Sequence, residues 1–305
     1  MEKKGELTTQ QIVVLIILIM SFVVILFFIF KLQPESTADD EVCHNSVIMK
    51  KNSIFAGQSS TPLNCRREYV CITTDGKCEG LSNPEIIEVK NADELYNALA
   101  EKMSDCWWMF GEGKIDYVGG ELTKNNYCSI CSQILFDPSL KKLDEFKEVD
   151  ISKEEVYKYM GRTKMSSDGV TYLEYLFGTK TWEDFSSLVQ TKELNNFGEI
   201  EIGKQYFIIM GITSNVGQQW TVGGSAIGSL IGNFVPIKGS TFIGGAIGYG
   251  VGLVGEQISG TFTPEIGAIV INGNGVENQF MAPTIQEMDS DKFKLLNCED
   301  ILTYA

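Results

Sequence analysis

Histidine is almost absent from this sequence: among 305 residues there is one, His44. Ser–His–Asp and Cys–His catalysis would both depend on that side chain, and zinc sites built from several histidines are excluded. The sequence lacks a G-x-x-x-x-G-K-[ST] loop for phosphates and an N-x-[ST] glycosylation sequon. It also lacks a long run of Lys and Arg, and its formal charge is −15, which argues against nucleic-acid binding. No catalytic set, cofactor or metal site is therefore predicted.

A long apolar run lies near the N-terminus. Residues 12–30 are uncharged, and all except Ser21 are apolar. A helix of this length reaches about 28 Å, close to the roughly 30 Å of a bilayer's hydrocarbon core. Lys3 and Lys4 precede the run and favour a cytoplasmic N-terminus. The sequence predicts a cytoplasmic tip and single-pass anchor over 1–31, with the lipid bilayer as a partner and the body on the extracytoplasmic side.

Two other interpretations of this segment stay open. A cleaved signal peptide usually has an apolar region of about 7–15 residues followed by a small-residue site, and Ser36-Thr37-Ala38 is such a site after a longer run. The second interpretation is a prepilin-like leader, because Lys3-Lys4-Gly5-Glu6 precedes the helix. Processing after Gly5 would leave a helix able to pack into a filament, as in a pilin-like subunit.

Every cysteine follows the apolar run. An even number on one side of an anchor predicts up to four disulfides. The segment Glu68–Thr73 is typical of a strand, and Asp75-Gly76 is a hairpin signal, so Cys71 and Cys78 are expected to lie close together. The other pairings are left open. The eight disulfide candidates are Cys43, Cys65, Cys71, Cys78, Cys106, Cys128, Cys131 and Cys298.

Cys128-Ser129-Ile130-Cys131 is a C-x-x-C motif, which occurs in zinc sites and thioredoxin-like redox sites. Zinc would need two further ligands, and a redox cysteine would favour a helix N-terminus. The following residues, Ile130–Phe136, instead predict a strand. Structural disulfides are therefore favoured over metal or redox chemistry.

The body is expected over 61–217 and 261–305, after a stalk at 32–60 that includes a first strand, Ser46–Met49. Asn91 can cap a helix and Glu94 can complete a capping box. Gly111 and Gly113 are expected to end this helix. Its apolar face is predicted to contain Leu95, Leu99, Met103, Cys106, Trp107 and Phe110. Strands are expected at Tyr127–Phe136, Gln205–Ile212, Ile266–Ile271 and Phe280–Met288, and short helices at Val170–Phe177 and Trp182–Val189.

A glycine-rich block at 218–260 interrupts this body. It is typical of a helical hairpin with a turn at Asn233–Ser240. Small residues four apart let two helices approach closely, so the block is interpreted as an inserted glycine zipper. Insertion into a membrane and packing outside it, on the body or on copies of the hairpin, both stay open. The packing glycines are Gly224, Gly228, Gly232, Gly244, Gly248 and Gly252.

The string Cys106-Trp107-Trp108-Met109-Phe110-Gly111-Glu112-Gly113-Lys114 is the most distinctive in the chain. It is interpreted either as a helix end that buries aromatic side chains beside a disulfide, or as an exposed aromatic patch of Trp107, Trp108 and Phe110. With Lys3–Gln10, Tyr172–Leu176 and the glycine block, the string resembles a group of uncharacterised archaeal single-pass membrane-anchored proteins. The resemblance implies an archaeal envelope protein and assigns no role to any residue.

The predicted fold class is therefore α+β: an N-terminal transmembrane helix, then a disulfide-stabilised ectodomain with an inserted glycine-zipper hairpin. The predicted function is a membrane-anchored envelope protein that assembles with itself or with other envelope proteins through the hairpin. One alternative is an extracytoplasmic enzyme, either a thiol–disulfide oxidoreductase using the C-x-x-C or a hydrolase without a recognised motif. The other is a pilin-like filament subunit.

Overall fold

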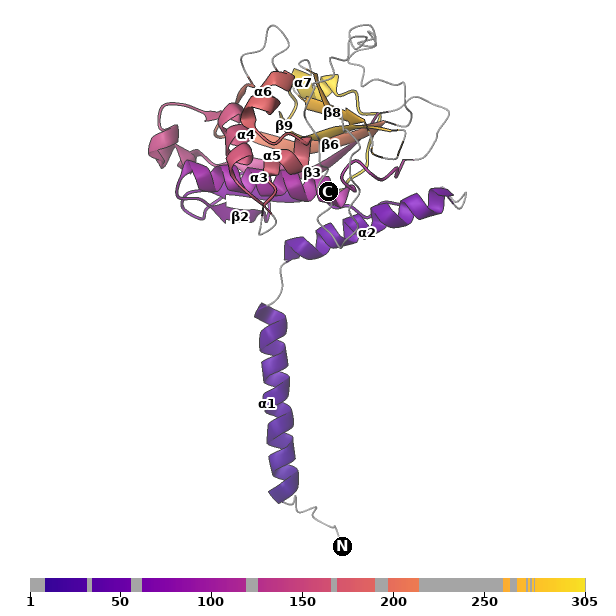
Figure 1. Cartoon of the computed structure of the whole chain (residues 1–305). Coiled ribbons are helices and arrows are strands. Elements are labelled where there is room, and N and C mark those ends of the chain that lie inside the picture. The colour runs from indigo at the N-terminus through magenta and orange to yellow at the C-terminus, as the bar shows by residue number, and fades with distance from the viewer. Residues whose placement is uncertain are drawn as a thin grey trace. The chain divides into compact units, whose positions relative to one another are not determined.

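The computed structural model divides the chain into two units, Met1–Asp39 and Asp40–Ala305. It describes residues 9–31, 35–55, 62–118, 126–165, 169–189, 197–213, 260–263, 268–272, 274, 276 and 278–304. Figure 1 shows the helices and strands of both units. The glycine block at 218–259 lies outside the described residues, so the predicted zipper hairpin stays a prediction.

Helix α1, Thr9–Lys31, forms most of the first unit. In the described part of the chain, however, no helix is both long enough and apolar enough to cross a membrane. This finding corrects the predicted transmembrane helix, and with it the single-pass localisation and its cytoplasmic N-terminus.

Helix α2 runs from Glu35 to Phe55. It occupies most of the predicted stalk and includes Ser46–Met49, where a strand was predicted. Cys43 and Val47 are four residues apart, so a helix places them on one face. Both are buried, and Cys43 is bonded to Cys65. The strand prediction was wrong because this helical spacing, and not alternation along a strand, buries the apolar residues.

The second unit is built on one mixed sheet. Its strands follow the order β2-β1-β3-β6-β9-β8-β7, and β10 pairs with β3. The β2-β1-β3 pairs are parallel and the remaining pairs along the main order are antiparallel. The strands are β1 Glu68–Thr73, β2 Glu85–Glu88, β3 Asn126–Phe136, β6 Gln205–Thr213, β7 Gly260–Thr263, β8 Ala268–Asn272, β9 Gln279–Glu287 and β10 Asp300–Ile301.

This topology corrects the α+β prediction to a mixed α/β fold. Strands β2 and β3 both pair parallel to β1, and the chain crosses from β2 through α3 to β3. An α+β fold of separate helices and antiparallel strands would not contain this parallel crossover. The hairpin predicted at Asp75-Gly76 was also wrong, because the chain returns to pair β2 parallel to β1. The proximity of Cys71 and Cys78 is confirmed, since the two form a disulfide.

Helix α3, Ala92–Met109, covers the sheet and begins as predicted. The Asn91 side chain accepts a hydrogen bond from the Glu94 amide, and the Glu94 carboxylate accepts one from the Lys90 amide. Leu95, Leu99 and Met103 are fully buried. The other helical and short elements are η1 Pro138–Lys142, η2 Asp144–Phe146, β4 Ile151–Ser152, α4 Lys153–Arg162, α5 Tyr172–Phe177, α6 Trp182–Val189, β5 Glu199–Ile200 and α7 Asp291–Leu295.

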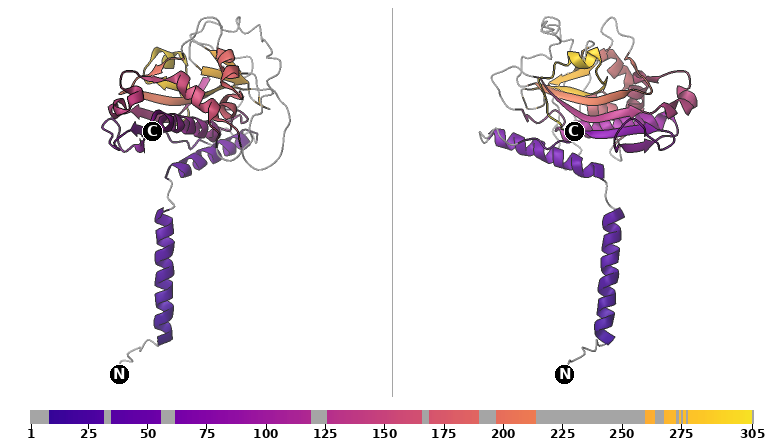
Figure 2. Two further views of the ribbon diagram at one scale, coloured as in Figure 1. Left: turned by 60° about the vertical axis from the view of Figure 1, so that its left-hand side comes forward. Right: turned by 180° about the vertical axis from the view of Figure 1, so that it is seen from behind.

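The sheet has a core on each face because side chains alternate along β6. Tyr206, Ile208 and Met210 belong to the main core, whereas Phe207 and Ile209 belong to a smaller cluster with residues of α7 and the segment after it. Helices α3 to α6 lie together on the main-core face (Figure 1), and a view from behind brings the strands forward (Figure 2). The fold is therefore a sheet with one thick helical layer and one thin cover.

Four disulfides take up every cysteine. They confirm the predicted number. Cys106–Cys131 joins α3 to β3, and Cys128–Cys298 joins β3 to the segment after α7. Cross-links that close such long loops restrict the unfolded chain, and each contributes about 2–4 kcal/mol.

We expect non-reducing peptide mapping to recover four linkages: Cys43–Cys65, Cys71–Cys78, Cys106–Cys131 and Cys128–Cys298. Denatured, unreduced protein should take up no alkylating reagent, because no thiol is free. Recovery of a Cys128–Cys131 linkage, or of alkylated peptides, would contradict this connectivity.

Candidate functional site: a groove along helix α3

The two cysteines of the C-x-x-C motif do not pair with each other. They lie on β3, where Cys128 bonds to Cys298 and Cys131 bonds to Cys106. Both are almost completely buried. Thiol–disulfide exchange needs an accessible sulfur for attack, so this arrangement favours the structural interpretation of the motif.

Most of the aromatic side chains in the Cys106–Lys114 string lie in the core. Trp107 and Phe110 are buried, and Trp107 packs edge-on against Phe280 of β9. The interpretation of these residues as an exposed aromatic patch is corrected, because the apolar face of α3 turns them onto the sheet. Trp108 is partly buried, and its ring stacks on His44 at 4.2 Å between centroids.

His44 has a structural environment. Its Nδ1 lies 2.8 Å from the backbone carbonyl oxygen of Trp108, and its ring is the one stacked on Trp108. These contacts join α2 to the end of α3. Both contacts are made to Trp108, so they support a structural role for His44.

Two glycines shape the end of α3, as the sequence predicted. Gly111 and Gly113 have φ values of +77° and +70°, a region that L side chains rarely adopt. A Cβ atom on Gly111 would overlap Ile115, and one on Gly113 would lie 3.1 Å from the Trp107 ring. The turn therefore needs glycine for both conformation and space. The predicted packing glycines of 218–260 lie outside the described residues.

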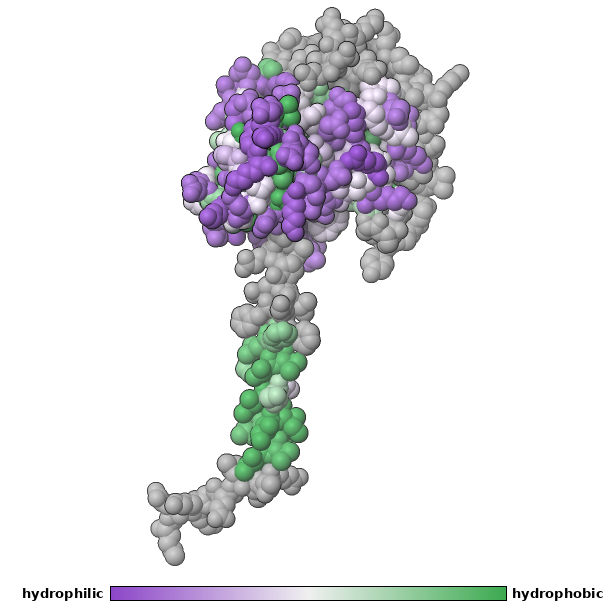
Figure 3. Space-filling model, turned by 90° about the vertical axis from the view of Figure 1, so that its left-hand side faces the viewer, coloured by the Kyte–Doolittle hydropathy of each residue, from purple (hydrophilic) through white to green (hydrophobic). Residues whose placement is uncertain are grey.

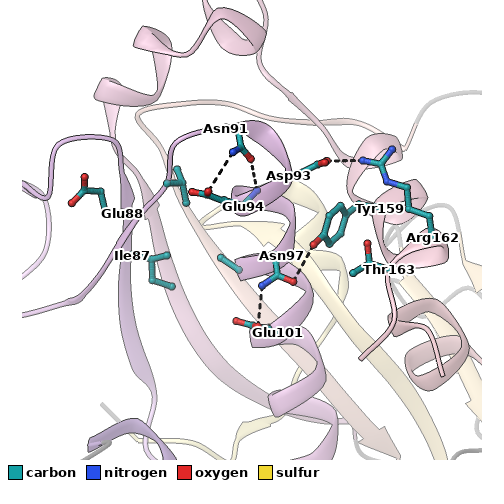
Figure 4. A pocket seen from close by; sticks show the side chains of 12 residues that line it. Ile87, Glu88, Asn91, Asp93, Glu94, Asn97, Glu101, Tyr159, Arg162 and Thr163 are labelled. Carbon is teal, nitrogen blue, oxygen red and sulfur yellow. Dashed lines mark hydrogen bonds and ion pairs between the residues drawn. The ribbon is translucent and has the colours of Figure 1, made fainter. Parts of the chain in front are cut away.

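A groove of about 840 Å³ lies in the described surface. It extends from the end of β2, at Ile87 to Val89, across the N-terminal half of α3 to α4 (Figure 4). A volume of this size is in the range of ligand sites. The groove is open, and its lining is polar and apolar in about equal parts, unlike the enclosed and mostly apolar pockets that take small molecules. The α3 and α4 residues that line it are Asp93, Glu94, Asn97, Ala98, Glu101, Tyr159 and Arg162, with Asn91 and Thr163 at their ends.

A chain of polar contacts holds the α4 side of the groove. Arg162 pairs with Asp93 at 2.5 Å. Tyr159 donates a hydrogen bond from its hydroxyl to Asn97 Oδ1 at 3.0 Å, and Asn97 Nδ2 donates to Glu101 Oε1 at 2.9 Å. Figure 4 shows these side chains pointing toward one another across α3 and α4. These contacts hold the α4 side of the groove in place.

Charged groups continue along α3 toward β1 and β2. Lys102 Nζ lies 2.7 Å from Glu68 Oε1 and 2.8 Å from Glu85 Oε2. The pKa of Glu68 is raised to about 7, chiefly by burial and also by its contact with Glu85, while Lys102 opposes the shift. One lysine is thus shared by two carboxyl groups at the start of the sheet.

Asp105, one helical turn further, is a second perturbed carboxyl. Burial raises its pKa to about 6, and the nearby carboxylate of Asp40 on α2 adds to the shift. No group of three or more His, Cys, Asp or Glu in the described residues is placed to hold a metal ion. Burial and like charge therefore explain the shift.

The sequence did not indicate this groove or its carboxyl groups. Capping identified Asn91 and Glu94, but only as the start of a helix. The spacing of Asn97 and Glu101, four residues apart, is a detectable sign of a helix-surface pair. The contributions of β2 and α4 depend on tertiary packing, for which no local signal exists.

We expect Asp105→Asn to stabilise the protein by about 1–2 kcal/mol at pH 8 and to have almost no effect at pH 4. The pKa of Asp105 is higher in the folded protein than its ordinary value of 3.8. The folded state therefore holds the proton to higher pH, and stability is lost as pH rises from about 4 through 6. Urea unfolding at both pH values measures the effect.

Asp144→Asn, at an exposed aspartate of η2, is the matched control. It removes the same charge without relieving burial, so it should change the free energy of unfolding little at either pH. Equal stabilisation by Asp105→Asn at pH 4 and pH 8 would contradict the assignment.

No protein-family model matches the chain, and no curated protein or solved structure is significantly similar to it. The resemblance drawn from the Cys106–Lys114 string therefore stays a prediction. The function has to be argued from the residues themselves, and the features available for that argument are the apolar surface of α1, the disulfide-linked body and the groove along α3.

Proposed function

We propose that this protein is an assembly protein, in which copies of the chain associate through α1 while the disulfide-linked unit provides a stable body. The observation that carries the proposal is the apolar surface of α1. The exposed large apolar side chains between Ile12 and Phe27 each have 43–62% of their surface accessible to solvent. Figure 3 shows this surface as a continuous hydrophobic column.

The apolar surface surrounds the helix. Leu15, Ile16, Ile17 and Leu18 are consecutive, so they point to different sides of α1, and each is 53–62% exposed. A helix that lies on the surface of a globular body would have one apolar stripe and one polar face. A helix apolar all round needs cover on every side.

Copies of the same helix can supply that cover. Covering one large apolar side chain contributes about 1.5–3 kcal/mol, and α1 presents more than a dozen. This is enough to offset the cost of association, which is at least several kcal/mol. A flat partner surface would cover one side only, whereas a bundle or filament places neighbours around each helix.

This proposal retains the assembly role expected from the sequence and assigns it to α1. It is closest to the pilin-like alternative, in which an apolar N-terminal helix packs among its copies. The zipper version depends on the block at 218–260, which lies outside the described residues. The oxidoreductase alternative loses support because Cys128 and Cys131 are buried and each is bonded to another cysteine.

We expect the full chain to sediment as an oligomer, and we expect Ile17→Lys with Val24→Lys to convert it to a monomer. These positions are seven residues apart and lie near one side of α1; they are 62% and 50% exposed, so charge there blocks packing without disturbing the body. Sedimentation velocity measures the change, and circular dichroism checks the fold.

Val149→Lys is the matched control, since Val149 is 58% exposed but lies outside α1. It should leave the oligomer intact. A wild-type chain that is monomeric in buffer or mild detergent would overturn the proposal, as would a double variant that keeps its oligomeric state. Monomers that bind lipid vesicles through α1 would also overturn it, because lipid and not another copy would then cover the helix.

A further inference from the structure

Strand β2 ends the main order of the sheet, and among the described strands it pairs only with β1. The amide of Val89 donates to the carbonyl of Thr73 at 2.9 Å, so the backbone groups of Val89 face β1. Backbone groups alternate sides along a strand. The N–H and C=O groups of Ile86 and Glu88 therefore point away from β1, toward the open edge.

The open edge adjoins the groove along α3. Ile87, Glu88 and Val89 form one side of the groove, and Glu94, Ala98 and Glu101 of α3 line the next part of it (Figure 4). A helix beside an unpaired strand edge leaves room for one more strand, whose backbone would bond to β2 and whose side chains on one face would meet α3.

The charge of the α3 side of the groove determines which kind of segment can bind beside β2. The carboxylates of Glu94 and Glu101 accept hydrogen bonds from the neutral donors Asn91, Lys90 N–H and Asn97, so their negative charge is not neutralised. Two cations beside these carboxylates are already paired, Arg162 with Asp93 and Lys102 with Glu68 and Glu85. A strand seated here would therefore place its side chains in a negative field.

A second copy of β2 is a poor occupant. Its sequence, Glu85-Ile86-Ile87-Glu88, begins and ends with carboxylates, and like charges across a strand pair are destabilising. A segment with basic residues at alternate positions would instead place each cation toward α3. Its intervening residues would lie on the face of Ile86, which is 47% exposed, where an apolar side chain gains contact.

We propose that the edge of β2 and the adjoining face of α3 bind an extended polypeptide segment in which basic and apolar residues alternate, added as a strand next to β2. Backbone bonds to Ile86 and Glu88 give affinity, and the α3 carboxylates give the preference for a basic partner. This inference is independent of assembly through α1, since it concerns a different surface.

The test is fluorescence anisotropy of the full chain with an eight-residue peptide of alternating lysine and valine. Glu88→Pro removes the outward N–H at an edge position that tolerates proline, and we expect it to weaken binding about tenfold. Glu88→Ala loses the same carboxylate but keeps the N–H, and should weaken binding less than threefold. Circular dichroism confirms that each variant is folded.

Two further comparisons separate strand addition from attraction to an acidic protein. Glu101→Gln should weaken binding more than Glu148→Gln, which removes the same charge from an exposed position outside the groove. A peptide of identical charge with alternate backbone amides methylated should bind at least tenfold more weakly. Absence of peptide binding would overturn the proposal, as would equal binding of the methylated peptide or equal effects of Glu101→Gln and Glu148→Gln.

Discussion

The packing of α3 against the sheet is the interaction on which the rest of the structure depends. Leu95, Leu99 and Met103 are fully buried on one face of the helix, and burying each contributes about 1.5–3 kcal/mol. The Cys106–Cys131 disulfide then joins the same face to β3. Because α3 connects β2 to β3, and both of these strands pair parallel to β1, this contact also holds β3 beside β1.

Several features of the second unit follow from the position of α3. Its buried face places Trp107 and Phe110 in the core, its C-terminal end supports His44, and its exposed face forms the wall of the groove. Lys102 extends from it to carboxyl groups of β1 and β2. The body is thus a disulfide-linked platform with one acidic face, whereas α1 carries the apolar surface assigned to assembly.

Local features of the sequence predicted much of the second unit. Capping residues and helical spacing identified α3, apolar runs identified β1, β3, β6 and β9, and an even number of cysteines predicted the disulfides. Errors arose where pairing between distant segments decides the outcome. Asp75-Gly76 signals a hairpin, but the sheet pairs β2 parallel to β1. Ser46–Met49 contains apolar residues suited to a strand. The segment is nevertheless helical, and its buried residues Cys43 and Val47 lie on one helix face.

The site was less predictable than the fold. Carboxylates such as Glu101 are ordinary helix-surface residues in the sequence, and they become a wall only because β2 and α4 lie on either side of α3. The prediction of a membrane anchor rested on the length of an apolar run, and it is corrected because no helix among the described residues is both long and apolar enough to cross a membrane. The proposed assembly role depends on the exposure of α1, which no sequence pattern measures.

Native-state hydrogen exchange of the intact, oxidised protein tests the central role of α3 most directly. If α3 and the sheet form one cooperative unit, the amides from Leu95 to Cys106 will exchange as slowly as those in the middle of β3 and β6, through global unfolding alone. Exchange in α3 that is orders of magnitude faster than in β3, with the sheet still protected, would contradict the account, because the helix would then open without the sheet.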